Sequence, residues 1–80
     1  MIRVIVRLNG GLERYASMRH LVEVCVEDGV TLASVQERLG IPRGEVGLFV
    51  VNRQLLNEDA PVPDGSIVDL YPTFGGGGWP

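Results

Sequence analysis

The chain has 80 residues, 45% of them hydrophobic, and a formal net charge of −3. This composition is typical of one small globular domain and excludes an intrinsically disordered chain. The mild acidity provides no basic footprint for nucleic acid or an anionic membrane, and no apolar run approaches the roughly 20 residues that span a bilayer. Cys25 and His20 are the single cysteine and the single histidine, so one chain forms neither an internal disulfide nor a metal cluster. We therefore expect a cytoplasmic protein that binds no nucleic acid, membrane or metal.

Two alternating segments near the N-terminus predict β-strands. Residues 2–8 and residues 21–27 alternate apolar and polar side chains, which is the period of a half-buried strand. Between them, residues 9–20 are mixed and polar, and we expect a loop there with at most a short helical turn. The apolar face of the two strands consists of Ile2, Val4, Val6, Leu8, Val22, Val24 and Val26.

The middle of the sequence predicts one main helix, over about residues 31–39. Thr31 is a good N-cap, because its hydroxyl can accept a hydrogen bond from a free N–H of the first turn. Gly40 suits a left-handed C-terminal cap, and Pro42 prevents the helix from continuing. The apolar stripe of this helix consists of Leu32, Val35 and Leu39.

The second half of the sequence predicts two or three further strands. Residues 48–51 are rich in β-forming side chains, residues 52–54 form a turn, and residues 55–56 form a brief strand. Residues 58–65 are dense in Pro, Asp and Gly and predict a loop, after which residues 66–72 form the last strand.

This order of elements predicts an α+β fold, the ubiquitin-like β-grasp, with a mixed four- to five-stranded sheet packed on one main helix. The last strand is expected to pair in parallel beside the first. The domain spans residues 1–72, and residues 73–80 form a flexible, glycine-rich tail with a Trp-Pro extension. The inner face of the sheet is predicted to present Val4, Val6, Val24, Val26, Val68 and Leu70 to the helix stripe.

At this level of detail the chain resembles a known family, the MoaD/ThiS group of small sulfur-carrier proteins of molybdenum-cofactor and thiamine synthesis. The resemblance covers essentially the whole chain, and the order and spacing of its segments make it specific. The segments that carry it are VRLNGGLERYA (6–16), DGVTLASVQERLGIP (28–42), VVNRQLL (50–56) and VPDGSIVDLYPTFGGGG (62–78).

The resemblance implies a carrier that is not an enzyme, has no catalytic residues and binds no cofactor. An E1-like activating enzyme of the MoeB/ThiF type would use ATP to adenylate a terminal glycine of the carrier. A sulfur donor protein would then supply the sulfur of a thiocarboxylate. The sulfur acceptor would be a synthase such as the large subunit of molybdopterin synthase. The long connection over residues 9–20 favours the molybdopterin type, since thiamine-type carriers tend to be shorter there.

The glycine run is the predicted site of this chemistry. Glycine lacks a Cβ, so its backbone can enter a narrow active site and leave the terminal carbonyl open to attack. Residues 73–78, if extended, reach roughly 20 Å. Gly78 is the predicted adenylate and thiocarboxylate position, with Gly77 as the alternative. The tail consists of Gly75, Gly76, Gly77 and Gly78, and it is followed by Trp79 and Pro80, which a processing peptidase would have to remove.

The outer face of the predicted sheet is unusually apolar. It would carry Ile5, Cys25, Leu48, Val50 and Tyr71, with Phe74 nearby on the tail. Monomers rarely expose a contiguous apolar patch without a use. We therefore predict that Val50, Tyr71 and Phe74 dock the activating enzyme. The alternative is that a different strand register buries some of these residues.

Two other functions remain open at this point. The chain could be a ubiquitin-like modifier that is conjugated to lysines of other proteins, or an interaction module whose tail is inactive and keeps Trp79 and Pro80. All seven basic residues are arginines. This bias reflects either the base composition of the genome or a carrier that cannot become its own side-chain target.

Overall fold

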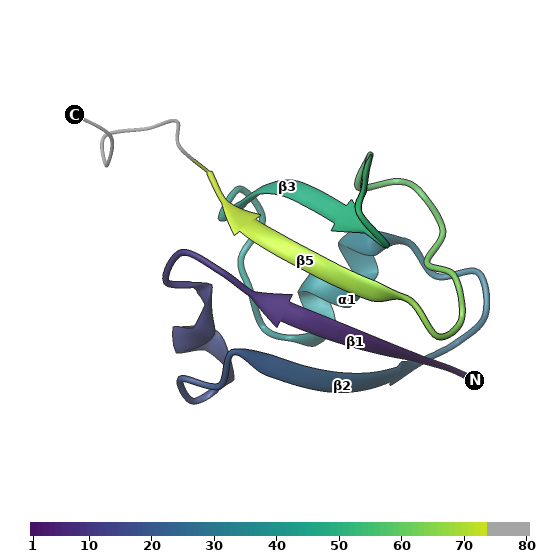
Figure 1. Ribbon diagram of the computed structural model, residues 1–80, viewed down its shortest axis with the longest axis horizontal. Coiled ribbons are helices and arrows are strands. Elements are labelled where there is room, and N and C mark those ends of the chain that lie inside the picture. The colour runs from purple at the N-terminus through teal and green to yellow at the C-terminus, as the bar shows by residue number, and fades with distance from the viewer. Residues whose placement is uncertain (74–80) are drawn as a thin grey trace.

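The computed structural model describes residues 1–73, which fold into a five-stranded sheet with a helix across one face (Figure 1). A short 3-10 helix, η1, follows the first strand, and one α-helix, α1, follows the second. The elements are β1 (Ile2–Leu8), η1 (Leu12–Ala16), β2 (Leu21–Val26), α1 (Leu32–Arg38), β3 (Val46–Val51), β4 (Gln54–Leu56) and β5 (Ile67–Pro72). This order confirms the predicted ubiquitin-like β-grasp.

The sheet has the strand order β2-β1-β5-β3-β4. β1 and β5 run parallel, as predicted, and Val6 pairs with Val68 in their register. The other neighbouring strands are antiparallel. The last strand therefore lies in the centre of the sheet, between β1 and β3 (Figure 1). β1 pairs with it as far as Leu70, and β3 pairs with it as far as Pro72.

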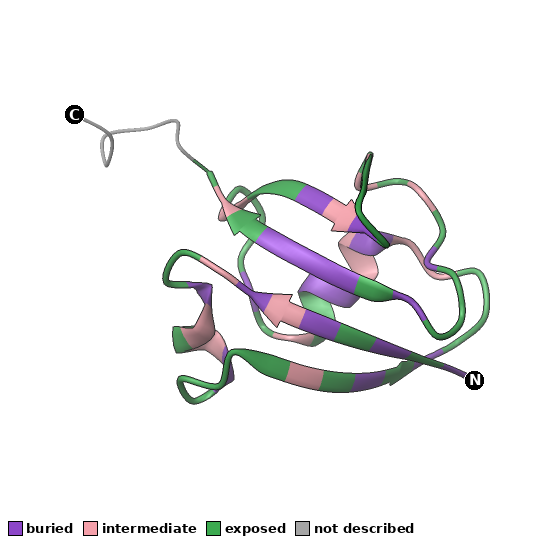
Figure 2. Cartoon of the chain, viewed as in Figure 1, coloured by how far each residue is buried: buried purple, intermediate pink, exposed green. Residues whose placement is uncertain are grey.

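The core lies between the sheet and α1. Figure 2 shows buried and exposed positions alternating along β1 and β2, which is the pattern of strands with one face on the core. All six inner-face strand residues predicted above are buried, as are Leu32 and Val35 of the helix stripe. Leu39, the C-cap residue of α1, is only half-buried but packs against the same core.

The sequence did not predict the contribution of the connections to the core. Leu12 and Ala16 of η1 are buried, and so are Ile41 after the helix and Val62 in the loop before β5. These residues stand in segments without a strand or helix period, so their burial depends on tertiary packing. The connections therefore enlarge a core that a chain of this size could not build from its strands alone.

The helix begins and ends as predicted. The hydroxyl of Thr31 accepts a hydrogen bond from the Ser34 N–H at 3.2 Å. Gly40 has φ of +76° and donates its N–H to the Glu37 carbonyl, so it closes the C-terminus in the left-handed conformation. Within residues 1–73, no helix is long and apolar enough to cross a membrane.

One polar side chain lies inside the core and was missed from the sequence. Gln36 on α1 is buried, and its Nε2 donates hydrogen bonds to the carbonyls of Pro42 at 2.8 Å and Ile41 at 3.4 Å. These carbonyls belong to the connection that follows α1, where the Pro42 carbonyl also accepts the Glu45 N–H at 3.2 Å. Gln36 thus fixes the path of the chain from α1 toward β3.

Candidate functional site

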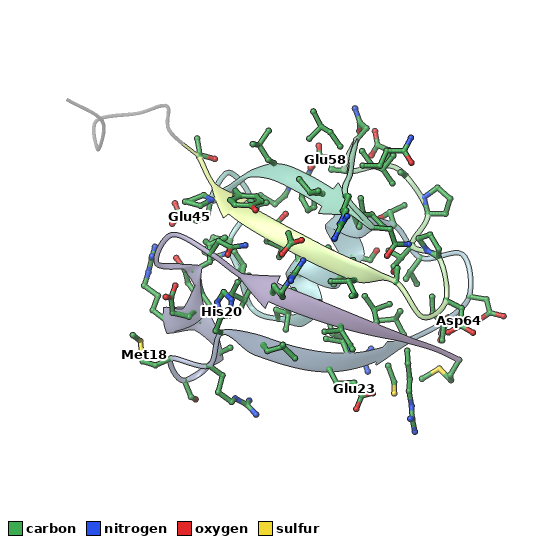
Figure 3. The ribbon with its side chains drawn as sticks, viewed as in Figure 1. Met18, His20, Glu23, Glu45, Glu58 and Asp64 are labelled. Carbon is green, nitrogen blue, oxygen red and sulfur yellow. The ribbon has the colours of Figure 1, made fainter. Side chains whose placement is uncertain are left out.

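The end of β5 is tied to the segment that precedes β3. The Thr73 N–H donates to the Glu45 carbonyl at 3.0 Å, and the Thr73 hydroxyl donates to the Gly44 carbonyl at 2.6 Å. Figure 3 shows Glu45 beside the end of β5, where the chain leaves the sheet. These two hydrogen bonds fix the position and direction of the chain immediately before Phe74.

Two glycines allow close packing around this end of β5. A Cβ on Gly10 would lie 2.6 Å from Cγ of Pro72, and Gly10 also has φ of +62°. A Cβ on Gly47 would lie 3.0 Å from the Pro72 carbonyl oxygen and 3.0 Å from Cα of Thr73. A side chain at either position would push the end of β5 away, so Gly10 is required by the approach of the Pro72 ring and Gly47 by the approach of the backbone of Pro72 and Thr73.

The carboxylate of Glu45 connects the same place to η1. Its Oε1 accepts a hydrogen bond from Nη2 of Arg14 at 2.8 Å and another from the Tyr15 hydroxyl at 3.2 Å. The Arg14 guanidinium also stacks over the Tyr15 ring, 4.6 Å from its centroid. Glu45 therefore holds the end of β5 through its carbonyl and η1 through its carboxylate.

The outer face of the sheet carries the apolar residues that the sequence placed there. Val50 on β3 pairs with Asp69 on β5, and Leu48 pairs with Tyr71, so Val50 and Tyr71 are near neighbours across the two strands. Ile5, Leu48, Ile67 and Tyr71 are each at least 36% exposed, which is high for apolar side chains on central strands. The predicted outer-face position of Val50 and Tyr71 is thus confirmed, whereas their predicted docking role stays a prediction.

An ion pair lies in the middle of this outer face, and the sequence analysis missed it. Nε and Nη2 of Arg7 donate to the two carboxylate oxygens of Asp69, at 2.6 and 2.8 Å. Arg7 and Asp69 are register partners of the parallel strands β1 and β5. The hydrogen bonds to Asp69, followed by the Coulomb attraction of its carboxylate, raise the pKa of Arg7 above its ordinary value.

The remaining predicted site residues lie outside the described part of the chain. They are the docking residue Phe74, the tail residues Gly75, Gly76, Gly77 and Gly78, and the extension Trp79 and Pro80. What the structure does place is the end of β5, next to the residues that lead into this tail. Among residues 1–73, no group of three or more His, Cys, Asp or Glu side chains could hold a metal ion.

The fold of this chain is shared with several known structures. A putative molybdopterin converting factor subunit 1 from Pyrococcus furiosus matches with a TM-score of 0.73 and 17% identity, over 90% of this chain and 98% of that chain. Small archaeal modifier protein 1 from Haloferax volcanii matches with a TM-score of 0.74 and 15% identity, over the same shares. Subunits 1 and 2 of the molybdopterin-converting factor from Helicobacter pylori form a complex that matches with a TM-score of 0.61 and 23% identity, over 95% of this chain and 100% of that chain. These matches confirm that the chain has a MoaD-like, ubiquitin-like β-grasp fold.

The amino-acid sequence identifies the family of the chain. No curated protein matches it significantly. Residues 1–76 match a family described as Mut7-C ubiquitin. The matched segment contains every strand and helix described above and extends into the glycine run. The chain therefore belongs to the Mut7-C ubiquitin family.

Proposed function

We propose that this chain is a sulfur carrier of the MoaD/ThiS type, a protein that is not itself an enzyme and is charged at a C-terminal glycine by its partners. The observation that carries the proposal is the anchored end of β5. Hydrogen bonds from Thr73 fix the chain immediately before Phe74, and the glycines 75–78 follow directly. Because the chain is fixed at Thr73, the glycine run that follows starts at a defined distance from the docking surface and can enter the active site of another protein.

The proposed chemistry needs a free glycine carboxylate. A peptidase first hydrolyses the Gly78–Trp79 bond and releases Trp79 and Pro80. The Gly78 carboxylate then attacks the α-phosphate of ATP in an E1-like activating enzyme, which forms an acyl-adenylate and releases pyrophosphate. A sulfur donor protein then delivers sulfur as sulfide, HS⁻, which attacks the acyl carbonyl, displaces AMP and leaves a thiocarboxylate. The alternative terminus is Gly77. The carrier binds no cofactor, because ATP is consumed by the activating enzyme.

The structural relatives support a synthase as the sulfur acceptor. The Helicobacter pylori structure is a complex of subunits 1 and 2 of a molybdopterin-converting factor, and its fold match covers 95% of this chain. By analogy, the acceptor of this carrier is a larger synthase subunit that receives the tail. Transfer of the sulfur to the acceptor and hydrolysis regenerate the Gly78 carboxylate for another cycle.

The outer face of the sheet is the proposed docking surface for these partners. Val50 and Tyr71 lie on the two strands nearest the tail, and Phe74 follows the anchored Thr73. A partner that covers Val50 and Tyr71 would receive the tail in a fixed direction, because Tyr71 lies on β5 and the anchored Thr73 follows this strand directly. Apolar contacts with this surface would supply the affinity for the partner, and the glycines would allow the tail to enter the partner's active site.

The intact mass of the protein from its native cells tests the proposal. Loss of Trp79 and Pro80, together with replacement of one oxygen by sulfur, is the expected result. Trypsin sharpens the measurement, because Arg53 is the last basic residue and the peptide that begins at Gln54 reports the C-terminus directly. A full-length, sulfur-free peptide in cells that are making the sulfur-containing product would rule the proposal out.

A protein modifier is the second candidate, and the match to small archaeal modifier protein 1 favours it. In that function, the activated glycine would form isopeptide bonds with lysines of other proteins. The expected result is then a series of heavier conjugates that contain the peptide from Gln54 joined to a foreign lysine. An interaction module with an inactive tail would give neither conjugates nor a thiocarboxylate, and its Trp79 and Pro80 would persist.

A further inference from the structure

The turn between β3 and β4 is strained at a position that usually belongs to glycine. It consists of Asn52 and Arg53, with φ of +50° and +71°, between the paired residues Val51 and Gln54. A turn of this kind requires a left-handed conformation at both positions. Asparagine tolerates that conformation, whereas glycine is strongly preferred at the second position. Arg53 is therefore an outlier that calls for a reason.

The contacts of the turn explain Asn52 and leave Arg53 unexplained. Asn52 donates its N–H to the Ile67 carbonyl at 2.9 Å, and its Oδ1 accepts a hydrogen bond from the Ile67 N–H at 3.0 Å. Within residues 1–73, Arg53 makes no side-chain hydrogen bond and no ion pair. The strained backbone thus presents a guanidinium that stabilises nothing in the described part of the fold.

This guanidinium stands beside a hollow on the outer face. The hollow has a volume of about 340 Å³ and is lined by Arg7, Asn52, Arg53 and Ile67. We call it the arginine hollow. Arg7 is already neutralised by Asp69, so Arg53 leaves the hollow with one uncompensated positive charge.

Most of the other arginines, unlike Arg53, have a partner in the described part of the chain. Among residues 1–73, the arginines that lie within 4.0 Å of a carboxylate oxygen are Arg3, Arg7, Arg14 and Arg43. Arg19 donates to the Ala16 carbonyl. Arg38 has no such partner in the described residues, but it lies on α1, which covers the inner face of the sheet (Figure 1). In a chain with net charge −3, Arg53 therefore marks a local positive site on the proposed docking surface.

We propose that the arginine hollow binds a carboxylate from an acidic segment of the protein that docks on the outer face. The planar guanidinium of Arg53 can form a bidentate pair of hydrogen bonds with a carboxylate. The apolar side chain of Ile67 excludes water from one side of this pair and so reduces the screening of its charges. A single uncompensated charge suits one carboxylate better than a doubly charged phosphate. On the proposed function, which this inference extends, the acidic segment belongs to the activating enzyme.

The substitution Arg53→Gly separates binding from stability. Glycine relieves the left-handed strain, so the variant should unfold at the same temperature as the unmodified chain or a higher one. The same variant loses the guanidinium and should lose affinity for the partner. A residue retained only for structure would not combine a stability gain with a loss of binding. Arg53→Lys keeps the charge without the planar fork and should bind with intermediate affinity, while Arg38→Ala is the matched control.

The first experiment uses the activating enzyme from the same cells and the carrier ending at Gly78. ATP–pyrophosphate exchange is measured against carrier concentration. We expect Arg53→Gly to raise KM for the carrier roughly tenfold and to leave kcat within about twofold, because the charge acts in docking and not in adenylation. Arg38→Ala should leave both constants unchanged. An unchanged KM for Arg53→Gly overturns the proposal.

The second experiment tests the hollow without the enzyme. The full chain, labelled with ¹⁵N, is titrated with a hexaglutamate peptide and, separately, with inorganic phosphate. We expect saturable shifts at the amides of Asn52, Arg53 and Ile67 with the peptide, which disappear in Arg53→Gly. Equal shifts with phosphate, or no shifts with the peptide, overturn the carboxylate site. If the peptide binds but the chain is never adenylated, the proposed function fails and the arginine hollow remains.

Discussion

The two faces of the sheet are built from the same strands and differ in the burial and the charge of their side chains. On the inner face, Val4, Val6 and Val68 are fully buried beneath α1. On the outer face, the residues next to them in sequence include the exposed Ile5 and Ile67 and the ion pair of Arg7 and Asp69. Figure 2 makes the contrast visible as alternating bands along β1 and β2.

The contrast indicates how a small β-grasp domain can separate the residues that stabilise it from those available for recognition. Burial of apolar area on the inner face supplies the favourable free energy of folding. The outer face can therefore keep apolar and charged groups in water, where a partner can reach them. Since a strand alternates its side chains strictly, neither function interferes with the other. The comparison predicts large stability effects for inner-face substitutions and small ones for outer-face substitutions.

The largest expected effect comes from Leu70→Ala on the inner face of β5. Leu70 is 1% exposed, so removing its side chain leaves a cavity, and the free energy of unfolding should fall by about 2–5 kcal/mol. Leu48→Ala, at a 41% exposed position on the outer face, should change it by less than about 0.5 kcal/mol. Urea unfolding followed by circular dichroism measures both.

A loss of this size can leave so small a domain unfolded at 25 °C. In that case Ile41→Val, at a position 2% exposed, gives a milder test, with an expected loss of about 0.5–1.5 kcal/mol. Equal costs for Leu48→Ala and Leu70→Ala would contradict the division of the two faces.

The next effect concerns the end of β5, which leads into the tail. Gly10→Ala combines a positive φ with a Cβ only 2.6 Å from Pro72 and should lower the free energy of unfolding by about 2–3 kcal/mol. Gly29→Ala is the matched control, because Gly29 has φ of +86° but no atom within 4 Å of the added Cβ. Its cost should be about 1 kcal/mol.

Thermal unfolding distinguishes the two glycine variants, since 1 kcal/mol shifts Tm by about 4–8 °C in a domain of this size. Hydrogen exchange adds a local readout. The Thr73 amide, bonded to the Glu45 carbonyl, should lose protection in Gly10→Ala and keep it in Gly29→Ala. Equal Tm values for the two variants would mean that the end of β5 can shift without cost.

A smaller effect is expected from Gln36→Leu, which makes the inner side entirely apolar at this position. Leucine keeps much of the volume but leaves the Ile41 carbonyl without its donor, whereas the Pro42 carbonyl keeps the hydrogen bond from the Glu45 N–H. The free energy of unfolding should fall by about 1–2 kcal/mol. Glu37→Leu, at the exposed neighbouring position, is the control and should stay within about 0.5 kcal/mol. A neutral Gln36→Leu, measured by urea unfolding, would show that water replaces the amide.

Much of this fold could be predicted because its signals are local. The alternation in β1, the cap at Thr31 and the left-handed Gly40 each depend on a few consecutive residues, and all were confirmed. The parallel pairing of β1 with β5 followed from the order of the elements. The burial of η1 and the role of Gln36 could not be predicted, because both depend on segments that meet only after folding.

The candidate site divides in the same way. The outer-face position of Val50 and Tyr71 followed from strand alternation. The pairing of Arg7 with Asp69 required the register of β1 against β5, and a sequence alone does not define that register. A signal was nevertheless present, since Arg7 and Asp69 are charged residues at the outward positions of two strands predicted to be neighbours. The strain at Arg53 was invisible without backbone angles.

The smallest expected effect tests the outer-face ion pair. Asp69→Asn removes the charge that faces Arg7 and should lower Tm by about 2–5 °C, because the pair is partly exposed and partly screened. Asp59→Asn makes the same charge change at an exposed position and should leave Tm unchanged. Because the pKa of Arg7 is raised in the folded protein, its contribution is complete below the ordinary arginine pKa and is lost only as pH rises through the higher folded value. The Tm difference between the unmodified chain and Asp69→Asn should therefore be the same at pH 7 and pH 9, and a difference that shrinks by pH 9 would show that Arg7 is not the group that Asp69 stabilises.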